Sequence, residues 1–356
     1  MSVHAYTSFS YSYLNRARVL AASLRRIHPD WIIWAVMTDK EPQGFALDKN
    51  SEDFDRWINA EELFGEETDR WLFGHDIVEA CTAVKGEAMK HLLQHPGCTK
   101  VVYFDPDIAV FNTLNPMIDM LDNHSIVLTP HQIDPEPKSD KVAVRDNEIT
   151  SLGYGVFNLG FLAVANDDEG VRFANWWADR LYDWCHDRTD IGVFVDQKWC
   201  DLVPCFFNNV RVLRDPGYNV ASWNLSQRKM SFDEHGSALI NGQLLRFYHF
   251  TKLGTVGDIM TERYARGNME IHELWSWYRR QVTAATETGI PKGWWYYGVF
   301  DNGVQIPKAV RELYRDRQDL RAAFKSPRNV ENGFFDWLRH ESNLMDDGLD
   351  KGFHPT

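Results

Sequence analysis

Two carboxylates one residue apart, Asp105 and Asp107, are the side chains of this 356-residue chain whose type and spacing suggest chemistry most directly. They follow the apolar run 101–104, which indicates a buried strand, and Pro106 between them cannot donate to a neighbouring strand. The sequence therefore predicts both acids at the carboxyl end of a core strand, where open α/β sheets bind ligands. A divalent ion with oxygen ligands would relieve their mutual repulsion and could also hold a diphosphate. The competing interpretation is a plain turn, which Asp-Pro-Asp also favours.

The segments around these acids have the order of an α/β protein. A strand at 4–10, a helix at 13–26 with apolar residues at helical spacing, and a strand at 31–37 form a βαβ start. A polar segment at 130–150 with three prolines predicts a loop beside the site. The remaining predicted core elements are helices at 75–94 and 171–186 and strands at 125–129, 156–164 and 244–250.

Composition excludes several classes of partner. The net charge of −13 argues against nucleic acid, because a polyanion would be repelled over a broad surface. The five cysteines form no CxxC pair, which predicts free thiols in a reducing compartment and no zinc cluster. No leader peptide and no membrane-spanning stretch is recognisable, so we expect a cytoplasmic protein, with peripheral contact to the inner membrane as an option.

Four segments in order resemble one enzyme family. They are FDPD at 104–107, FNLGF at 157–161, VDQKW at 195–199 and FYHFTK at 247–252. Together with the opening strand and helix, they are similar to the metal-dependent retaining glycosyltransferases of family 8, the lipooligosaccharide galactosyltransferase and glycogenin group. The resemblance implies a type A glycosyltransferase fold, a Rossmann-like mixed sheet. It places the nucleotide-sugar-binding catalytic domain at 1–256 and a helical, aromatic-rich extension at 257–356.

The resemblance also implies a metal site and a diphosphate site. Asp105, Asp107 and His249 match the family's ligands for Mn²⁺, or Mg²⁺ in its place, and an imidazole beside two carboxylates suits such an ion. Lys85 matches a basic residue above the donor, where a cation would offset charge on the leaving diphosphate. Lys252 matches a lysine that touches the donor phosphates, although its interval from His249 is shorter than in the family. The alternatives are a buried structural histidine at 249 and a solvated helix lysine at 85.

Further matches concern the donor sugar. Asn158 matches the strand beneath the sugar, and Asp196 and Gln197 match an Asp-Gln pair near the anomeric carbon. Retention requires either a weak nucleophile or a polar group that stabilises an oxocarbenium-like ion pair there, and both remain open. Asp196 could instead be the N-cap of a helix.

The nucleotide itself should contact the first strand. Thr7, Ser8 and Tyr11 lie where the family binds uracil and ribose. The family often has acids or Asn at these positions, so the Thr-Ser-Phe-Ser sequence here leaves the base open.

The predicted function is transfer of a hexose from a nucleotide-diphosphate sugar to a glycan or glycolipid acceptor, with retention of the anomeric configuration. A UDP-sugar is the preferred candidate for the donor. The cytoplasmic location and the family analogy suggest a bacterial cell-surface glycan precursor as acceptor, in polysaccharide biosynthesis. One alternative is a haloacid-dehalogenase-like phosphatase, which also uses Asp-x-Asp but near the start of its chain. Another is a nucleotide-sugar-binding protein without activity.

The C-terminal extension carries two aromatic clusters, WSWY at 275–278 and WWYY at 294–297. Trp and Tyr rings stack on sugars and also settle at lipid headgroups, and Arg279 and Arg280 would suit anionic lipid. We therefore expect this segment to present the acceptor or to contact a membrane face. The alternative is that these rings close a helical subdomain over the main core.

Overall fold

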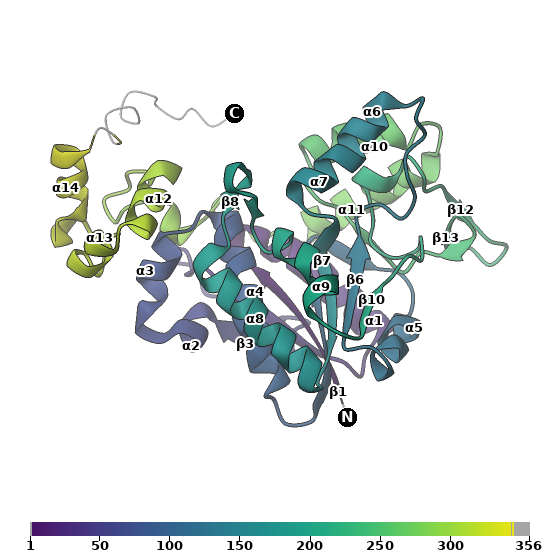
Figure 1. Ribbon diagram of the computed structural model, residues 1–356, viewed down its shortest axis with the longest axis horizontal. Coiled ribbons are helices and arrows are strands. Elements are labelled where there is room, and N and C mark those ends of the chain that lie inside the picture. Colours follow the sequence, from purple (N-terminus) through teal and green to yellow (C-terminus); the bar gives the residue numbers. More distant parts are fainter. Residues whose placement is uncertain (1, 343, 345–356) are drawn as a thin grey trace.

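The protein is built on one mixed sheet of seven strands (Figure 1). The structure is a computed structural model and describes residues 2–342 and 344. β7 runs antiparallel to its neighbours β6 and β4, and the other neighbouring pairs are parallel, so the predicted α/β fold with a mixed, Rossmann-like sheet is confirmed. In spatial order the strands are β10 (Val210–Val212), β6 (Ile126–Pro130), β7 (Phe157–Ala165), β4 (Cys98–Phe104), β1 (Ser2–Phe9), β2 (Ile32–Met37) and β3 (Arg56–Asn59).

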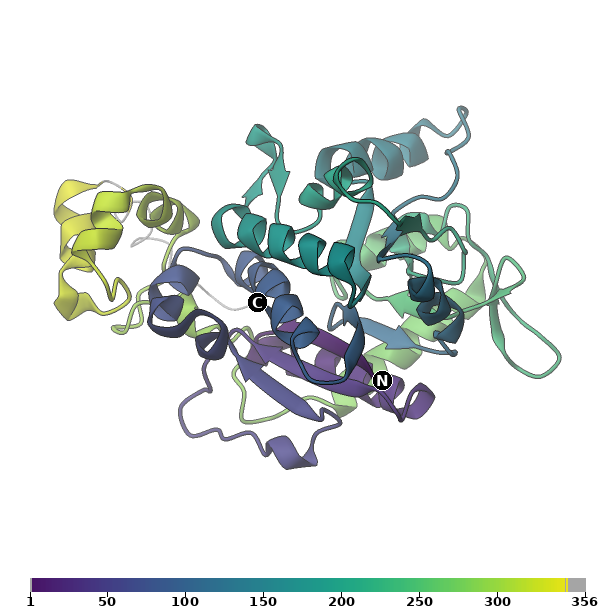
Figure 2. The same cartoon turned by 60° about the horizontal axis from the view of Figure 1, so that its bottom comes forward.

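Helices cover both faces of this sheet because its strands are apolar on both. Along β4, Val102 and Phe104 belong to one buried cluster and Val101 and Tyr103 to another, as the two-residue period of a strand requires. Figure 2 shows α4 and α8 packed side by side on one face. The covering helices are α1 (Leu14–Ile27) on the first face, and α4 (Ile77–Leu93) and α8 (Asp168–Trp184) on the second.

A smaller sheet brings a late segment of the chain against the strand that follows β4. It contains β11 (Val220–Ala221), β15 (Phe247–His249) and β5 (Ile108–Val110), with β15 antiparallel to β5. The strand predicted at 244–250 is thus divided, and its second half lies in this sheet rather than in the central one. The other short strands are β8 (Asp187–Arg188) with β9 (Val193–Phe194), and β12 (Met230–Phe232), β13 (Ala238–Ile240) and β14 (Gln243–Leu244).

The loop predicted at 130–150 is wrong for its second half. Residues from 141 onwards form α6 (Lys141–Ala143), a π-helical turn at Val144–Ile149 and α7 (Thr150–Tyr154). The three prolines all precede residue 138, so they leave this part free to coil. The Asp140 side chain then caps the first turn through the Ala143 N–H.

The C-terminal extension packs in separate places along the main body. α10 and α11 cover the smaller sheet, while α12 to α14 surround Phe73 at the opposite end of the molecule (Figure 1). The division at residue 256 into two domains stays a prediction. The helices of this segment are α10 (Val256–Tyr264), α11 (Met269–Ala284), α12 (Lys308–Asp316), α13 (Gln318–Ala323) and α14 (Phe334–Glu341).

The remaining helices are short. They are α2 (Ala60–Phe64), α3 (Thr68–Phe73), α5 (Asn115–Ile118) and α9 (Val203–Phe206). Among the residues that the structure describes, no helix has both the length and the apolar character needed to cross a bilayer.

Candidate active site

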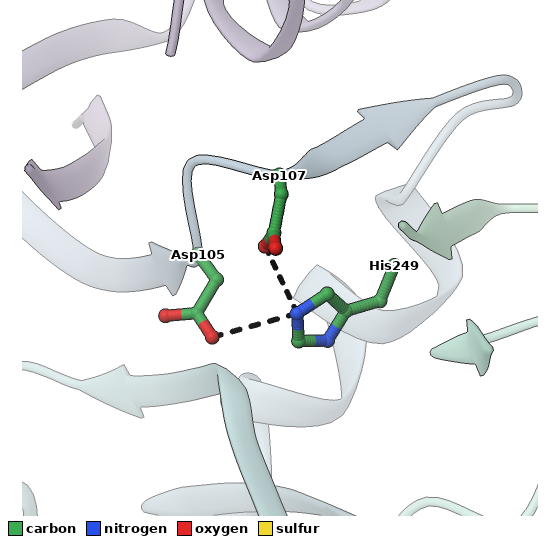
Figure 3. A group of neighbouring side chains, drawn as sticks. All are labelled: Asp105, Asp107 and His249. Carbon is green, nitrogen blue, oxygen red and sulfur yellow. Dashed lines mark ion pairs between the residues drawn. The ribbon is translucent and has the colours of Figure 1, made fainter. Parts of the chain in front are cut away.

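Asp105, Asp107 and His249 meet just beyond the carboxyl end of β4 (Figure 3). His249 Nε2 lies 3.0 Å from Asp107 Oδ1 and 3.6 Å from Asp105 Oδ2. One ligand atom from each side chain lies within 4.8 Å of the others. The side chain of Asp105 is 26% exposed, against 9% for Asp107 and 3% for His249. The group is therefore reached from solvent on the side of Asp105.

Backbone pairing explains why these distant residues meet. The Asp105 N–H donates to the Gly160 carbonyl at 2.8 Å, which places the end of β4 beside β7. His249 of β15 is paired with Ile108 of β5, and Ile108 is the residue that directly follows Asp107. Gly160 is required here because a Cβ at that position would lie 2.4 Å from the His249 ring. The ring therefore rests directly on β7.

Asn158 determines the orientation of the His249 ring. Its Oδ1 accepts hydrogen bonds from the Gly160 N–H at 3.2 Å and from Asn219 Nδ2 at 3.0 Å, and lies 3.2 Å from His249 Nδ1. An amide oxygen has no hydrogen to donate, so in the contact with His249 the donor must be the ring. Nδ1 therefore carries the hydrogen. The lone pair of Nε2 then faces the two carboxylates, which is the arrangement of a metal-binding histidine.

Three electron-rich groups turned toward one point require a cation. Burial disfavours the charged imidazole, but the Asp107 carboxylate outweighs burial and raises the pKa of His249. Reciprocally, burial is outweighed by His249, which lowers the pKa of Asp107. Two carboxylate oxygens and an imidazole nitrogen form a donor set that fits Mn²⁺ or Mg²⁺. The predicted metal residues are thus brought together.

Lys85 forms a buried ionic link between the acidic motif and Asp196. Its Nζ donates to Asp105 Oδ1 at 3.0 Å, to Asp196 Oδ2 at 2.7 Å and to the Leu159 carbonyl at 3.1 Å, and lies over the Tyr103 ring. The side chain is 2% exposed, so the alternative of a solvated helix lysine is wrong. Burial raises the pKa of Asp196, and Asp105 adds to this while Lys85 opposes it. Lys85 therefore fixes the position of both acids.

Asp196 and Gln197 follow a strained residue. Val195 has φ of +35°, a conformation that a β-branched side chain rarely adopts and that occurs where a site holds it. Asp196 does not cap the helical turn at Lys198–Leu202, whose N-cap is Gln197 without a capping side-chain bond. Gln197 is half-buried, and its Nε2 donates to the Tyr154 carbonyl at 2.9 Å. The predicted catalytic pair thus lies between Lys85 and the end of α7.

The predicted nucleotide residues lie deeper than a ligand-binding surface requires. Thr7 and Ser8 are buried within β1, and Ser8 Oγ donates to the Cys81 carbonyl at 2.6 Å. Tyr11 is buried too, with its hydroxyl on Glu41 at 3.1 Å. Their contact with a nucleotide stays a prediction, which this burial does not favour.

Two residues that the sequence interpretation missed are better exposed. Tyr13, two positions after Tyr11, is 37% exposed, and the Arg16 guanidinium lies 4.2 Å from the centre of its ring. Burial raises the pKa of Tyr13, and the charge of Asp107 adds to this. The helical turn at Tyr11–Tyr13 decides which tyrosine faces outward, and no signal in the sequence distinguishes the two.

Lys252 lies in the turn that follows β15 and is exposed, with φ of +52°. It is near His249 along the chain. No hydrogen bond or ion pair of its ammonium group is seen among the described residues, so the charge is available for an anion.

The aromatic clusters of the extension point inward. Trp275 and Tyr278 are buried against Tyr248 and Phe250, and the Tyr297 hydroxyl donates to Asp69. The other rings of the two clusters are half-buried. This supports the alternative in which these rings close the core and gives no support to membrane contact.

The fold and the site together define an α/β protein with a mixed sheet and a candidate divalent-metal site at its strand ends. No family model matches the chain. The uncharacterized protein YfnF of Bacillus subtilis (strain 168) is 28% identical over 177 residues, which are 49% of this chain and 57% of YfnF. The uncharacterized protein YfnD of the same strain is 29% identical over 99 residues, 27% of this chain and 32% of YfnD. The chain thus matches less than two thirds of the length of either relative.

Solved structures with a similar course of the chain include several glycosyltransferases. Galactosyltransferase LgtC with donor and acceptor sugar analogues is 16% identical with a TM-score of 0.46, over 83% of this chain and 99% of LgtC. The glycosyltransferase GlyE of Streptococcus pneumoniae TIGR4 is 15% identical with a TM-score of 0.40, over 79% of this chain and 64% of GlyE. Mouse xyloside xylosyltransferase 1 is 12% identical with a TM-score of 0.38, over 70% of this chain and 97% of the mouse chain.

Proposed function

We propose that this protein is a metal-dependent glycosyltransferase that moves a hexose from a nucleotide-diphosphate sugar to a glycan or glycolipid acceptor with retention of the anomeric configuration. The preferred candidate for the donor is a UDP-sugar. The observation that carries the proposal is the meeting of Asp105, Asp107 and His249 beside the buried Lys85–Asp196 pair. Four of these five residues lie in the sequence segments that resemble the family, and Lys85 lies outside them. A cytoplasmic location and a bacterial cell-surface glycan precursor as acceptor belong to the same proposal.

The donor diphosphate would be held through a divalent ion. Asp105, Asp107 and His249 would bind Mn²⁺ or Mg²⁺, which when bound supplies positive charge for the leaving diphosphate. Lys252 is exposed beside these residues and would contact a phosphate oxygen. Tyr13 is exposed just after β1, and its ring would offer a flat face for the nucleotide base. This assigns to Tyr13 the role that the sequence alone suggested for Tyr11.

The reacting sugar would lie above Asn158, Asp196 and Gln197. Asp196 is 3% exposed and bound to Lys85, which supports a role in stabilising positive charge on the sugar rather than as a free nucleophile. Gln197 is better exposed and would face the anomeric carbon with its amide. Lys85 would act through the two acids it orients and would not touch the diphosphate itself.

The phosphatase alternative fits this geometry less well. That family carries Asp-x-Asp near the start of its chain, whereas Asp105 here follows a complete βαβ unit. Asp105 Oδ1 is also bonded to Lys85 and to the Tyr103 hydroxyl at 2.6 Å, which leaves Oδ2 alone for attack. An inactive nucleotide-sugar-binding protein would hold its ligand with the same residues. Only a measurement of turnover distinguishes this alternative from an enzyme.

A panel of nucleotide-sugars tests the proposal. Purified protein is incubated with UDP-, GDP- and TDP-sugars in the presence of Mn²⁺ or of excess chelator, and release of nucleotide is followed together with transfer to added glycans. We expect release from one donor class that stops in chelator and in the Asp107→Asn variant. The Asp122→Asn variant, an exposed acid paired with Lys100, is the control and should keep full activity. Full activity in excess chelator, or hydrolysis of simple phosphate esters alone, would refute the proposal.

A further inference from the structure

A second cavity lies away from the metal residues, where α3, the end of α8, the β8–β9 hairpin and α12 meet. Figure 1 shows α3 and α12 side by side there, in agreement with the packing of Phe73 against Val310 and Tyr314. The volume is about 650 Å³, within the range of cavities that hold small ligands. None of the predicted catalytic, nucleotide or metal residues lines it.

The wall of this cavity is aromatic and open to solvent. The rings of Trp71 and Tyr182 are stacked, with centroids 5.6 Å apart and planes 15° from parallel. Tyr182 is 41% exposed and Trp184, two residues further, is 49% exposed. Exposed Trp and Tyr faces combine an apolar surface with a polar edge, as binding to the flat face of a sugar ring requires. In this exposure the rings of the wall differ from the aromatic clusters of the extension, whose rings are buried or half-buried.

The floor of the cavity contains two histidines with unused acceptor nitrogens. His75 Nδ1 lies 2.7 Å from the Trp71 carbonyl, and His186 Nε2 lies 3.0 Å from the Asp183 carbonyl. A carbonyl only accepts, so both of these nitrogens carry the hydrogen and the other nitrogen of each ring is an acceptor. His75 Nε2 and His186 Nδ1 are buried and have no hydrogen-bond partner among the described residues. Burial lowers the pKa of His75 to about 3 and of His186 to about 4, which keeps both rings neutral.

Two unpaired acceptors discriminate between ligand classes. The phosphate group of a fully ionised monoester has no hydrogen to donate to them, whereas a hydroxyl group has. A metal ion is disfavoured because Arg315, only 10% exposed, lies close enough to lower the pKa of both histidines.

Three of the four arginines that line the cavity are paired with acids, and the fourth, Arg321, is exposed with no ion pair among the described residues. Arg315 is paired with the buried Glu79, Arg188 with Asp190 and Arg70 with Glu67. Fixed in this way, these three act as oriented N–H donors rather than as an attraction for a polyanion. Arg315 Nε has no hydrogen-bond partner among the described residues and lies 3.6 Å from Asp316 Oδ1, so it adds one donor to the lining.

We propose that this cavity is a saccharide subsite that binds an uncharged, hydroxyl-rich sugar unit, with Trp184 and Tyr182 against the ring face and the His75 and His186 acceptors bonded by hydroxyls. The assignment of this sugar to a distal part of the acceptor glycan rests on the proposed function. The chain supports that link, because the β8–β9 hairpin leads from His186 directly to Val195, Asp196 and Gln197. Only ten positions separate His186 from Asp196. A long acceptor could therefore occupy the cavity and the reaction centre together.

Binding to a printed array of uncharged oligosaccharides and their phosphorylated counterparts tests the inference, followed by titration of the strongest binder. We expect the full-length protein to bind an uncharged oligosaccharide and the Trp184→Ala variant to lose about tenfold in affinity or more. Phe232→Ala removes an aromatic ring of similar exposure, 52%, on β12 and should not change binding. The Arg188→Met variant, at the exposed rim, gives a second test should Trp184→Ala fold poorly.

The outcomes separate this inference from the proposed function. Binding that survives UDP with Mn²⁺ and Asp107→Asn but not Trp184→Ala supports the subsite, whether or not sugar transfer is found. Binding that UDP with Mn²⁺ abolishes and Trp184→Ala leaves intact places the glycan at the reaction centre and overturns the subsite alone. Preference for the phosphorylated counterparts, or no oligosaccharide bound, also overturns it; in the latter case the histidine acceptors are satisfied by water only.

Discussion

Asn158 Oδ1 lies 3.2 Å from His249 Nδ1, and this contact decides which nitrogen of the imidazole faces Asp105 and Asp107. The amide belongs to β7 and the ring to β15, so the two sheets are joined at the point where the metal residues meet. Residues behind a metal ligand usually set its tautomer and its affinity for the ion.

Replacing Asn158 should weaken metal binding while all three ligands remain. We expect Asn158→Ala to lower Mn²⁺ affinity by about 10–100-fold, measured by calorimetry, because His249 then loses the acceptor that fixes Nδ1–H. Asn166→Ala, at the other end of β7, removes an amide bonded to the Leu93 and Cys98 carbonyls and serves as the control. Equal loss of affinity in both variants would show a general loss of stability rather than control of the tautomer.

Lys85 offers a test of the buried ion pairs. Lys85→Met leaves Asp196 buried without a cation, so we expect the free energy of unfolding to fall by about 3–5 kcal/mol in urea titrations. Lys90→Met, on the same helix but in a partly exposed pair with Glu87, should cost less than about 1 kcal/mol. If the two substitutions cost the same, the Lys85 pairs do not hold the site together.

The acidic motif and its strand could be predicted because the signal is local. An apolar run that ends in Asp-Pro-Asp leaves few alternatives for where pairing stops, and the structure ends β4 at Phe104. The burial of Lys85 could not be predicted in this way, because its partner Asp196 is 111 residues away along the chain. Which of Tyr11 and Tyr13 faces outward depends on one helical turn after β1, a geometry that the repeated tyrosines do not reveal.

Composition likewise misled about surface and interior. Dense aromatic residues near 275–278 and 294–297 are compatible with a binding surface or with a core, and only tertiary packing decides. The segment 130–150 appeared to be a loop because its prolines are concentrated in the first half, whereas Asn147 and Asp146 anchor the second half through Glu136 and Arg263.

Tyr278 tests the role of the extension in supporting the site. Its ring is stacked on Phe250 with centroids 3.8 Å apart, and Phe250 directly follows His249. Tyr278→Ala should therefore cost about 3–5 kcal/mol of unfolding free energy and also weaken Mn²⁺ binding. Trp277→Ala, the half-buried neighbour, is the control for aromatic truncation and should cost less. Deletion of 258–356 should unfold the protein, since it removes the α11 side chains that cover Tyr248 and Phe250. A truncated protein that remains folded would contradict this.

The buried histidines of the second cavity predict loss of stability in acid. Their pKa values, about 3 for His75 and 4 for His186, lie below the ordinary 6.5 because burial disfavours the charged ring. Between pH 6.5 and 4 the unfolded chain binds protons that the folded protein does not, so stability falls as the pH is lowered. The slope is about 1.4 kcal/mol per pH unit for each histidine within its window.

Thermal melts across this pH range measure the effect. The midpoint of the His75→Asn variant should fall less steeply with acid than that of the native protein, even if it starts lower at pH 7. His235→Asn, which alters a histidine whose side chain is 78% exposed, should leave the slope unchanged. An unchanged slope in His75→Asn would mean that this ring is not kept neutral by the fold.

Gln197 separates a role in the reaction from a role in holding α7. Its Nε2 donates to the Tyr154 carbonyl at 2.9 Å, so the amide is placed by the helix end while its oxygen remains for a ligand. If the oxygen or the amide dipole acts on the sugar only as charge develops, Gln197→Ala should lower kcat far more than it weakens nucleotide affinity.

Gln197→Glu retains the size and an oxygen but loses the donor to Tyr154, and therefore reports on the helix contact. Lys198→Ala, which removes the neighbouring bond to the Leu152 carbonyl at 2.8 Å, is the matched control for loosening α7. A large fall in kcat for Gln197→Ala with little change for Lys198→Ala would assign the amide to the reaction, and equal effects in the two variants would reduce it to support of the helix.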